Sequence, residues 1–300
     1  MKVAILIPTL NRKDFLLRTL KYYSLLKSIH PIYIGDASSI SMIEEINTVV
    51  RGRVVVHYFH WPGLSDRDTI KKLAQKASVD CEYCAFQGDD DFFVPNSLSI
   101  CAEFLSNNDS FRTAQGNAAV ILLDRPGAYG NIKALGPYWN SPALHGSSGT
   151  ERLKEITENY WVPNFSVHRT IELIADFTDK YPVKDRYWGE LTNTFSCAIN
   201  GKSKFIDIFY LIRNVHDGID HQASQHGWRE SQGWDDSFSA CKLTLSEKLR
   251  DNSGDVIAMT RLEVQFLLDK YLARTQIKWD KILRSRRQFG IIDFLRHSRV

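Results

Sequence analysis

The 300-residue chain lacks any hydrophobic run long enough to cross a bilayer. Its longest wholly aliphatic run covers residues 118–123, whereas a membrane-spanning helix needs about 20 apolar residues. The N-terminus passes directly into a strand-like run at residues 2–7, and no signal-peptide cleavage site is visible. We therefore expect a cytoplasmic protein without a membrane-spanning segment.

Cysteine is also scarce and shows no pattern. The five cysteines are an odd number without a repeated spacing, which argues against a disulfide framework and against a four-cysteine zinc site. Cys81 and Cys84 have the spacing of a redox or half-zinc motif, but no second ligand pair accompanies them. We interpret both as buried structural residues of a reduced protein.

What the chain does contain is an ordinary globular composition in which residues alternate between strand-like and helical patterns. The first hundred residues predict helices over residues 14–26, 41–50 and 66–77, and strands over residues 2–7, 32–34, 54–59 and 83–86. Strands separated by helices imply right-handed crossovers. The expected fold class is therefore α/β, with a mostly parallel central sheet flanked by helices.

The rest of the chain is less regular. It predicts helices over residues 98–105, 151–160, 171–177 and 189–198, and strands over residues 118–123, 162–168 and 204–212. Residues 125–149 are rich in Gly, Pro, Ser and Asn and read as a long functional or mobile loop. Because the pattern is helical from Trp234 to the end, we expect a main domain over 1–233, divided near residue 110, and a helical extension over 234–300.

The end of this extension is basic. Residues 274–300 hold eight Lys or Arg against two Asp, so the net charge of +3 is local rather than general. Such a segment could contact an anionic membrane surface peripherally, at the inner face, or an acidic partner. It could equally be a solvated basic helix that closes the domain.

Three consecutive carboxylates, Asp89, Asp90 and Asp91, follow the predicted strand at residues 83–86. Adjacent like charges repel, so a chain that groups them normally offsets the repulsion with a divalent cation or with nearby Lys and Arg. The carboxyl ends of strands in an open α/β sheet are also where ligands bind. The triplet therefore predicts a metal site, with a solvated acidic turn as the alternative.

Several segments together resemble glycosyltransferase family 2, whose members have the GT-A fold. Residues 3–12 (VAILIPTLNR) resemble the opening strand and loop of that family, and residues 34–38 (IGDAS) resemble its second strand and turn. Residues 88–95 (GDDDFFVP) resemble its metal motif, and Arg67 opens the helix before the motif strand. The likeness covers about the first 110 residues well, and the remainder only in the order of features.

The resemblance implies a role for each of these residues. It implies that Asp89 lies near the donor ribose and that Asp90 or Asp91 binds Mn²⁺ or Mg²⁺, which would stabilise the departing diphosphate as a Lewis acid. It also implies that Asp36 accepts a hydrogen bond from the base and that Arg67 contacts base or phosphate. The remaining residues expected at the nucleotide are Pro8, Thr9 and Arg12.

A second constellation lies at residues 187–191 (YWGEL), where one carboxylate stands beside two aromatic residues. Desolvation there could raise the pKa of Glu190 towards that of a useful general base. An inverting transfer needs such a base to remove the proton from the acceptor hydroxyl. Glu190 is therefore the expected catalytic residue, with Asp185 as the second choice; a helix N-terminal Glu stabilised by the helix dipole is the structural alternative.

A histidine follows the predicted strand at residues 204–212. Related enzymes often take a further metal or phosphate contact from a His or Arg at such a place, so His216 is a candidate ligand. His221 and His226 follow in a polar stretch that could fold over the donor.

The predicted function is metal-dependent, inverting transfer of a sugar from a nucleoside diphosphate donor to a hydroxyl of a glycan or lipid-linked acceptor. UDP is the favoured nucleotide of the donor. Nucleic acid is not an expected partner. A nucleotidyltransferase is disfavoured because residues 8–12 contain no glycine to cradle a triphosphate. A phosphatase or nuclease lacks the expected additional acidic residues, and a silent nucleotide-sugar-binding protein of the same fold stays open.

Overall fold

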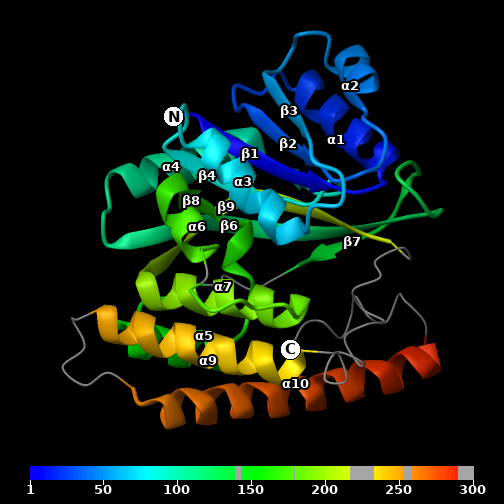
Figure 1. Ribbon diagram of the computed structural model, residues 1–300. Coiled ribbons are helices and arrows are strands. Elements are labelled where there is room, and N and C mark those ends of the chain that lie inside the picture. The colour runs from blue at the N-terminus through cyan, green and yellow to red at the C-terminus, as the bar shows by residue number, and fades with distance from the viewer. Residues whose placement is uncertain (139–142, 179, 217–232, 253–258, 290–300) are drawn as a thin grey trace.

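The computed structural model describes residues 1–138, 143–178, 180–216, 233–252 and 259–289, with side chains described as far as residue 276. A nine-stranded sheet in the order β3-β2-β1-β4-β8-β6-β9-β5 forms its centre, and β7 pairs with β6 beside this path. Helices cover the sheet, and a further layer of helices lies below it (Figure 1). The α/β class predicted from the sequence is confirmed.

The first part of the sheet is parallel. It pairs the strands β1 (Val3–Thr9), β2 (Ile32–Asp36), β3 (Val56–His60) and β4 (Tyr83–Phe86), which the chain connects through the helices α1 (Lys13–Leu25), α2 (Ile43–Val50) and α3 (Asp66–Ala77). β1 does not stop before Pro8 as the sequence suggested, because Pro8 pairs with Gly35 and Thr9 with Asp36. The carboxyl ends of β1, β2 and β4 therefore lie along one edge.

The second part of the sheet is mixed. Its strands are β5 (Phe92–Phe93), β6 (Phe111–Leu123), β7 (Ile132–Pro137), β8 (Val167–Arg169) and β9 (Lys202–Val215), and α4 (Pro95–Ser106) lies between β5 and β6. β6 and β9 are parallel, whereas β8 joins β4 to β6 by antiparallel pairing. Residues 125–149 are not wholly a loop, because they contain β7, whose Ile132 and Leu135 are exposed. The sheet as a whole is therefore mixed, whereas its first four strands are all parallel.

The helical layer holds α5 (Gly149–Glu158), α7 (Arg186–Asn200), α9 (Trp234–Asp251) and α10 (Arg261–Phe289). Along the chain, η1 (Pro163–Phe165) lies between α5 and β8, and α6 (Thr170–Asp176) lies between β8 and α7. One hydrophobic core joins these four helices, with Leu153 from α5, Phe195 from α7, Leu245 from α9 and Leu268 from α10. The residues after 233 therefore share their core with α5 and α7.

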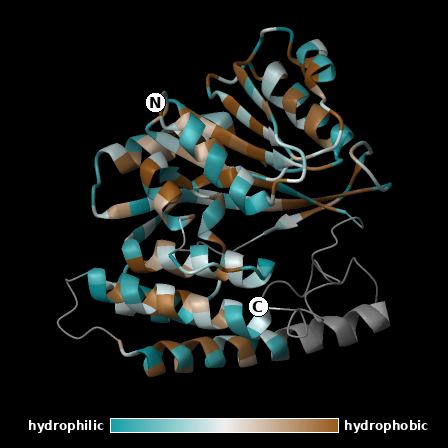
Figure 2. Ribbon diagram, in the orientation of Figure 1, coloured by the Kyte–Doolittle hydropathy of each residue, from teal (hydrophilic) through white to brown (hydrophobic). Residues whose placement is uncertain are grey.

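Apolar residues of β1 alternate between two further cores. Val3, Ile5 and Ile7 pack with α1, α2 and α4 on one face of the sheet, and Ala4 and Leu6 pack with α3 and α6 on the other. Figure 2 shows the hydrophobic strands at the centre and helices with one hydrophobic side. Burying strands on both faces explains why they appear as continuous apolar runs in the sequence.

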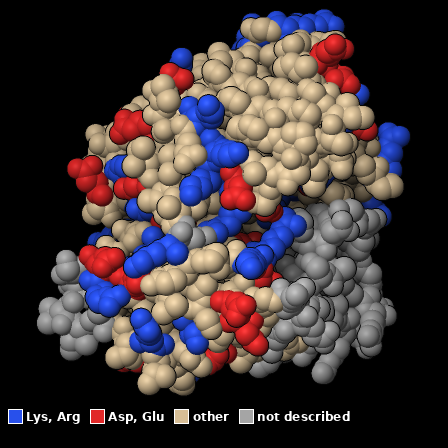
Figure 3. Space-filling view, in the orientation of Figure 1, with Lys and Arg blue, Asp and Glu red and all other residues tan. Residues whose placement is uncertain are grey.

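Two further features bear on the expectations. All five cysteines are free and buried, which confirms the burial predicted for Cys81 and Cys84. No helix within the described residues is long and apolar enough to span a membrane. In Figure 3, Lys and Arg side chains gather across the middle of the visible face, where the α/β part meets the helical layer.

Candidate active site

The acidic triplet lies in a buried turn directly after β4. Asp89, Asp90 and Asp91 are 2%, 7% and 1% exposed, so the solvated acidic turn is excluded. A Cβ at Gly88 would stand 2.6 Å from Oδ1 of Asp90, and this close approach explains the glycine. The turn therefore carries three carboxylates into the protein at the edge where β1 and β2 also end.

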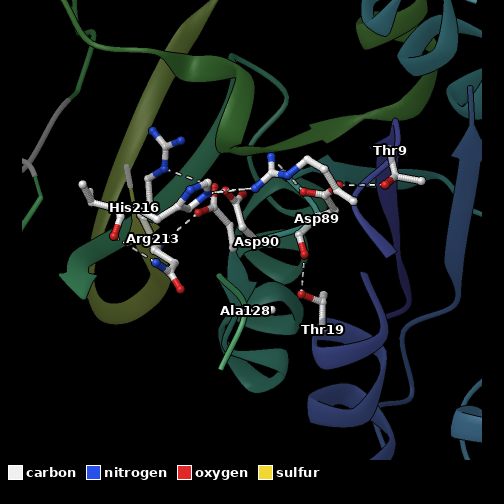
Figure 4. Close-up of polar contacts among 12 residues, drawn as sticks. Thr9, Thr19, Asp89, Asp90, Ala128, Arg213 and His216 are labelled. Atoms are coloured by element: carbon white, nitrogen blue, oxygen red, sulfur yellow. Dashed lines mark hydrogen bonds and ion pairs between the residues drawn. The ribbon is translucent and has the colours of Figure 1, made fainter. Parts of the chain in front are cut away.

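Asp89 and Asp90 face residues of the first helix and its preceding loop (Figure 4). Asp89 accepts a hydrogen bond from Oγ1 of Thr9 at 2.7 Å, and its backbone oxygen accepts one from Thr19. Arg12 bridges the two carboxylates, with Nη1 3.1 Å from Oδ1 of Asp89 and Nη2 donating to Oδ2 of Asp90 at 2.6 Å. The Asp89 Oδ1 contact lacks hydrogen-bond geometry, so that buried oxygen is left without a hydrogen-bond partner.

His216 enters from the other side, at the end of β9. Its Nε2 lies 2.8 Å from Oδ2 of Asp90 and 2.9 Å from Nη2 of Arg12. Its ring stacks on Phe15 of α1, with centroids 4.7 Å apart. The fold thus brings together two residues separated by 126 positions, as the prediction of a shared site requires.

Asp91 faces a different cation, Arg213. Nε of Arg213 donates to Oδ2 of Asp91 at 3.1 Å, and the backbone N–H of Asn214 donates to Oδ1 at 3.2 Å. The guanidinium carbon also lies 4.9 and 4.5 Å from the ring centroids of Tyr138 and Phe165. Both oxygens of Asp91 are therefore engaged, and its partner is fixed by two aromatic rings.

Arg18 completes the cationic surroundings. It donates to Oδ1 of Asn214 and to the backbone oxygens of Asp90 and Ala128. Of the two ways to offset grouped carboxylates, the described structure therefore uses arginine. Burial raises the pKa of Asp89 to about 7 and that of Asp91 to about 6, each against the opposing charge of an arginine. For Asp90, burial is outweighed by the hydrogen bonds of His216 and Arg12, which lower its pKa.

The donor set nevertheless suits a divalent cation in part. Within the described residues, no group of three or more His, Cys, Asp or Glu is arranged to hold an ion. Asp90 and His216 do present a carboxylate oxygen and an imidazole nitrogen 2.8 Å apart. Such a pair can hold Mn²⁺ or Mg²⁺ when substrate phosphates supply further oxygens. The orphaned oxygen of Asp89 beside this pair is consistent with a ligand-binding site.

The expected nucleotide residues lie along the same edge. Pro8 and Thr9 end β1, and Asp36 ends β2 opposite Thr9. Asp36 is fully buried and accepts hydrogen bonds from Oη of Tyr58 at 2.6 Å and from the backbone N–H of Ser38 at 2.9 Å. Both of its oxygens are engaged within the chain, which favours a role in shaping this turn.

Arg67 lies against α7. Its Nη2 donates to Oδ1 of Asn193 at 2.6 Å, and its side chain faces Gly189, where an added Cβ would lie 3.6 Å from Cδ of Arg67. It thereby connects α3 with the helix that carries Glu190.

Asp185 and Glu190 occupy different environments on that helix. Asp185 is the N-cap of α7 and accepts a hydrogen bond from the backbone N–H of Trp188 at 2.9 Å. Oε1 of Glu190 accepts a hydrogen bond from Oη of Tyr160 at 2.8 Å. Glu190 stays accessible to water, but the protein packed around it removes part of its hydration, and this desolvation raises its pKa against the charge of Arg213. Glu190 and the acidic triplet therefore share Arg213 as an electrostatic neighbour.

Sequence reasoning missed Arg18, Tyr58 and Tyr160. Arg18 looks like an ordinary residue of α1. Tyr58 lies on β3, 22 residues after Asp36, and Tyr160 follows α5, 30 residues before Glu190. His221 and His226 lie outside the described residues, as do most of the side chains of the basic segment 274–300.

No protein-family model and no curated protein matches the sequence. Solved structures do resemble the fold. Residues 1–349 of S. aureus TarS bound to UDP-GlcNAc superpose with a TM-score of 0.57 at 14% identity, over 91% of this chain and 72% of that one. The same fragment without a named ligand gives 0.55 at 12% identity, over 91% and 71%. A longer TarS structure gives 0.54 at 13% identity, over 91% of this chain but only 43% of that one. The chain has a GT-A-like glycosyltransferase fold.

Proposed function

We propose that this protein is a metal-dependent, inverting glycosyltransferase that uses a nucleoside diphosphate sugar and transfers the sugar to a hydroxyl of a glycan or lipid-linked acceptor. The observation that carries the proposal is the buried triplet Asp89–Asp91 at the carboxyl edge of the sheet, with arginines around it and an accessible carboxylate, Glu190, nearby. UDP is the favoured nucleotide because TarS, of the same fold, is known in complex with UDP and with UDP-GlcNAc.

The chain's own residues suit the binding of a doubly charged anionic group. Arg12, Arg18 and Arg213 surround the triplet from three directions. Guanidinium groups bind phosphate oxygens well because their donors match them in pairs. Asp90 and His216 would hold the Mn²⁺ or Mg²⁺ ion, which supplies Lewis-acid stabilisation of the leaving diphosphate.

Glu190 suits the role of the base. It is open to solvent, so an acceptor hydroxyl can reach it, and its raised pKa makes its carboxylate a better proton acceptor. The hydrogen bond from Tyr160 fixes the orientation of Oε1 and leaves the other oxygen for the acceptor. Asp185 is less suitable because its carboxylate caps α7.

Donor turnover tests the proposal. We expect UDP to raise the melting temperature in the presence of Mn²⁺, because a ligand that binds only the folded state stabilises it. We also expect Mn²⁺-dependent release of UDP from a UDP-sugar, with loss of this activity in Asp90→Ala. A screen in which no nucleoside diphosphate changes the melting temperature would contradict the proposal, and donor binding without turnover in any acceptor mixture would favour a silent binding protein.

A further inference from the structure

Arg12 stands where the proposed cation ligands meet. Its Nη2 lies 2.6 Å from Oδ2 of Asp90 and 2.9 Å from Nε2 of His216, and these two atoms are themselves 2.8 Å apart. The three atoms thus form a closed triangle of contacts. A guanidinium has only donors and keeps its positive charge, so it can be a counterion to Asp90 but never a metal ligand.

The positive charge of Arg12 competes with a dication for the same acceptors. An ion held by Asp90 and His216 would stand within a few ångströms of the Arg12 guanidinium, and like charges at such separations repel strongly in a site of low water content. Arg12 also donates to Oδ2 of Asp90 and lies 3.1 Å from the orphaned oxygen of Asp89. The carboxylates therefore have their counter-charge without an ion as long as Arg12 stays in place.

Arg12 is also the partner most able to leave. About a third of its side chain is exposed, whereas Asp89 and Asp90 are almost fully buried. It precedes the first turn of α1, next to Asn11, whose backbone has a positive φ of 53°. Its guanidinium packs on one ring only, that of Phe15, at 4.5 Å. Arg213, by contrast, is fixed between Tyr138 and Phe165.

We propose that Arg12 closes the cation site in the nucleotide-free protein and moves onto the diphosphate when the donor binds. This inference rests on the proposed function, since it uses the same Asp90 and His216 ligands. Arg12 is then a positioning residue that couples the two binding events. The protein alone should bind Mn²⁺ weakly, and the nucleotide should strengthen the binding because it takes the competing guanidinium away.

Mn²⁺ binding measured by the electron paramagnetic resonance signal of the free ion tests this coupling. In nucleotide-free protein, we expect Arg12→Gln to bind Mn²⁺ at least about tenfold more tightly than the wild type, since the competing charge is gone. With UDP present, the wild type should gain much more affinity for Mn²⁺ than Arg12→Gln does.

Arg18→Gln is the matched control, because it removes the same charge from the same cluster. Arg18 donates to the backbone oxygen of Asp90, whereas the contact between Asp90 and His216 is made by the side-chain Oδ2. A general electrostatic effect would raise Mn²⁺ affinity equally in both variants, whereas direct competition predicts a clearly larger rise in Arg12→Gln. Should Arg12→Gln fail to fold, Arg12→Met also removes the competing charge while keeping an unbranched side chain beside Phe15, and it should likewise bind Mn²⁺ more tightly than the wild type.

The outcomes separate this inference from the proposed function. Equal Mn²⁺ affinity of wild type and Arg12 variants without nucleotide would overturn the role of Arg12, even if all of them bind Mn²⁺ and UDP together. Absence of Mn²⁺ binding in every protein, with and without UDP, would instead remove the cation site, and with it both the metal step of the proposed function and this inference.

Discussion

The two carboxylate regions of this protein are built in opposite ways. Each side chain of the triplet at residues 89–91 meets a cation or a strong donor, so negative charge is neutralised where it is buried. Glu190 has a neutral phenol, Tyr160, as its hydrogen-bond partner, and Arg213 acts on its pKa through charge. A carboxylate surrounded by arginines is suited to binding, whereas a partly desolvated one with a neutral partner is suited to accepting a proton.

The largest expected effect comes from removing the base. Glu190→Gln should lower kcat by about 10²- to 10⁴-fold while leaving UDP affinity nearly unchanged, because a general base acts on the chemical step. Steady-state kinetics and calorimetric titration with UDP check both halves. The control is Asp185→Asn, since asparagine caps a helix about as well as aspartate does and removes only the charge. An unchanged kcat in Glu190→Gln, or a collapse in Asp185→Asn, would reverse the assignment of the base.

The free energy of unfolding should depend on the triplet more than on Glu190. Asp91→Ala leaves the charge of Arg213 without its buried partner, and breaking a buried pair in this way costs about 3–5 kcal/mol of unfolding free energy. Because 27% of the Arg213 side chain remains exposed, the lower end of that range is expected. Urea denaturation measures the difference. Glu190→Gln should unfold close to the wild type, and Lys13→Gln, which breaks an exposed pair with Glu45, serves as a surface control. Equal losses of unfolding free energy in Asp91→Ala and Glu190→Gln would show that the two regions do not differ in this way.

The sequence predicted the region of the triplet better than the region of Glu190, and the reason is physical. Helix α3 and strand β4 begin and end where their patterns predicted, since Ser65 caps α3 and buried strands keep an unbroken apolar run. The triplet follows β4 directly, so its place at the sheet edge could be inferred from local order. The arginines could not be assigned to it in this way, because Arg18 and Arg213 reach it only through the pairing of β5 with β9 and the packing of α1.

The contacts of Glu190 could be predicted from local sequence even less well than those of the triplet. Its helix was predictable from spacing, but Tyr160 is 30 residues away and approaches only through the packing of α5, α7 and α10 in one core. The strand order, the antiparallel insertion of β8 and the short strand β7 also depend on pairing between distant segments. No periodicity within a single segment encodes such contacts.

The smallest effect we expect concerns how Tyr160 tunes Glu190. Its hydroxyl donates to the ionised carboxylate, and this hydrogen bond lowers the pKa of Glu190 against the larger raising effect of burial. Burial keeps the pKa of Tyr160 well above its ordinary value, so the phenol stays a donor over the working range. Since the base must be ionised, the rate rises as the pH rises through the pKa of Glu190. Tyr160→Phe should raise that pKa further, so the acidic limb of the pH profile of kcat should move to higher pH.

A purely structural role of Tyr160 would give a different result. Loss of packing alone would lower kcat by a similar factor at every pH, whereas loss of the hydrogen bond lowers it several-fold on the acidic side and leaves the alkaline plateau close to the wild type. Tyr187→Phe is the matched control, because it removes a hydroxyl from the same aromatic group, one that meets the hydroxyl of Tyr271 at 3.2 Å. If both variants keep the wild-type limb, Glu190 is not the group that titrates in catalysis. A limb that moves only in Tyr160→Phe connects the measured pKa to this one carboxylate, because no other change in that variant alters the charge balance around Glu190.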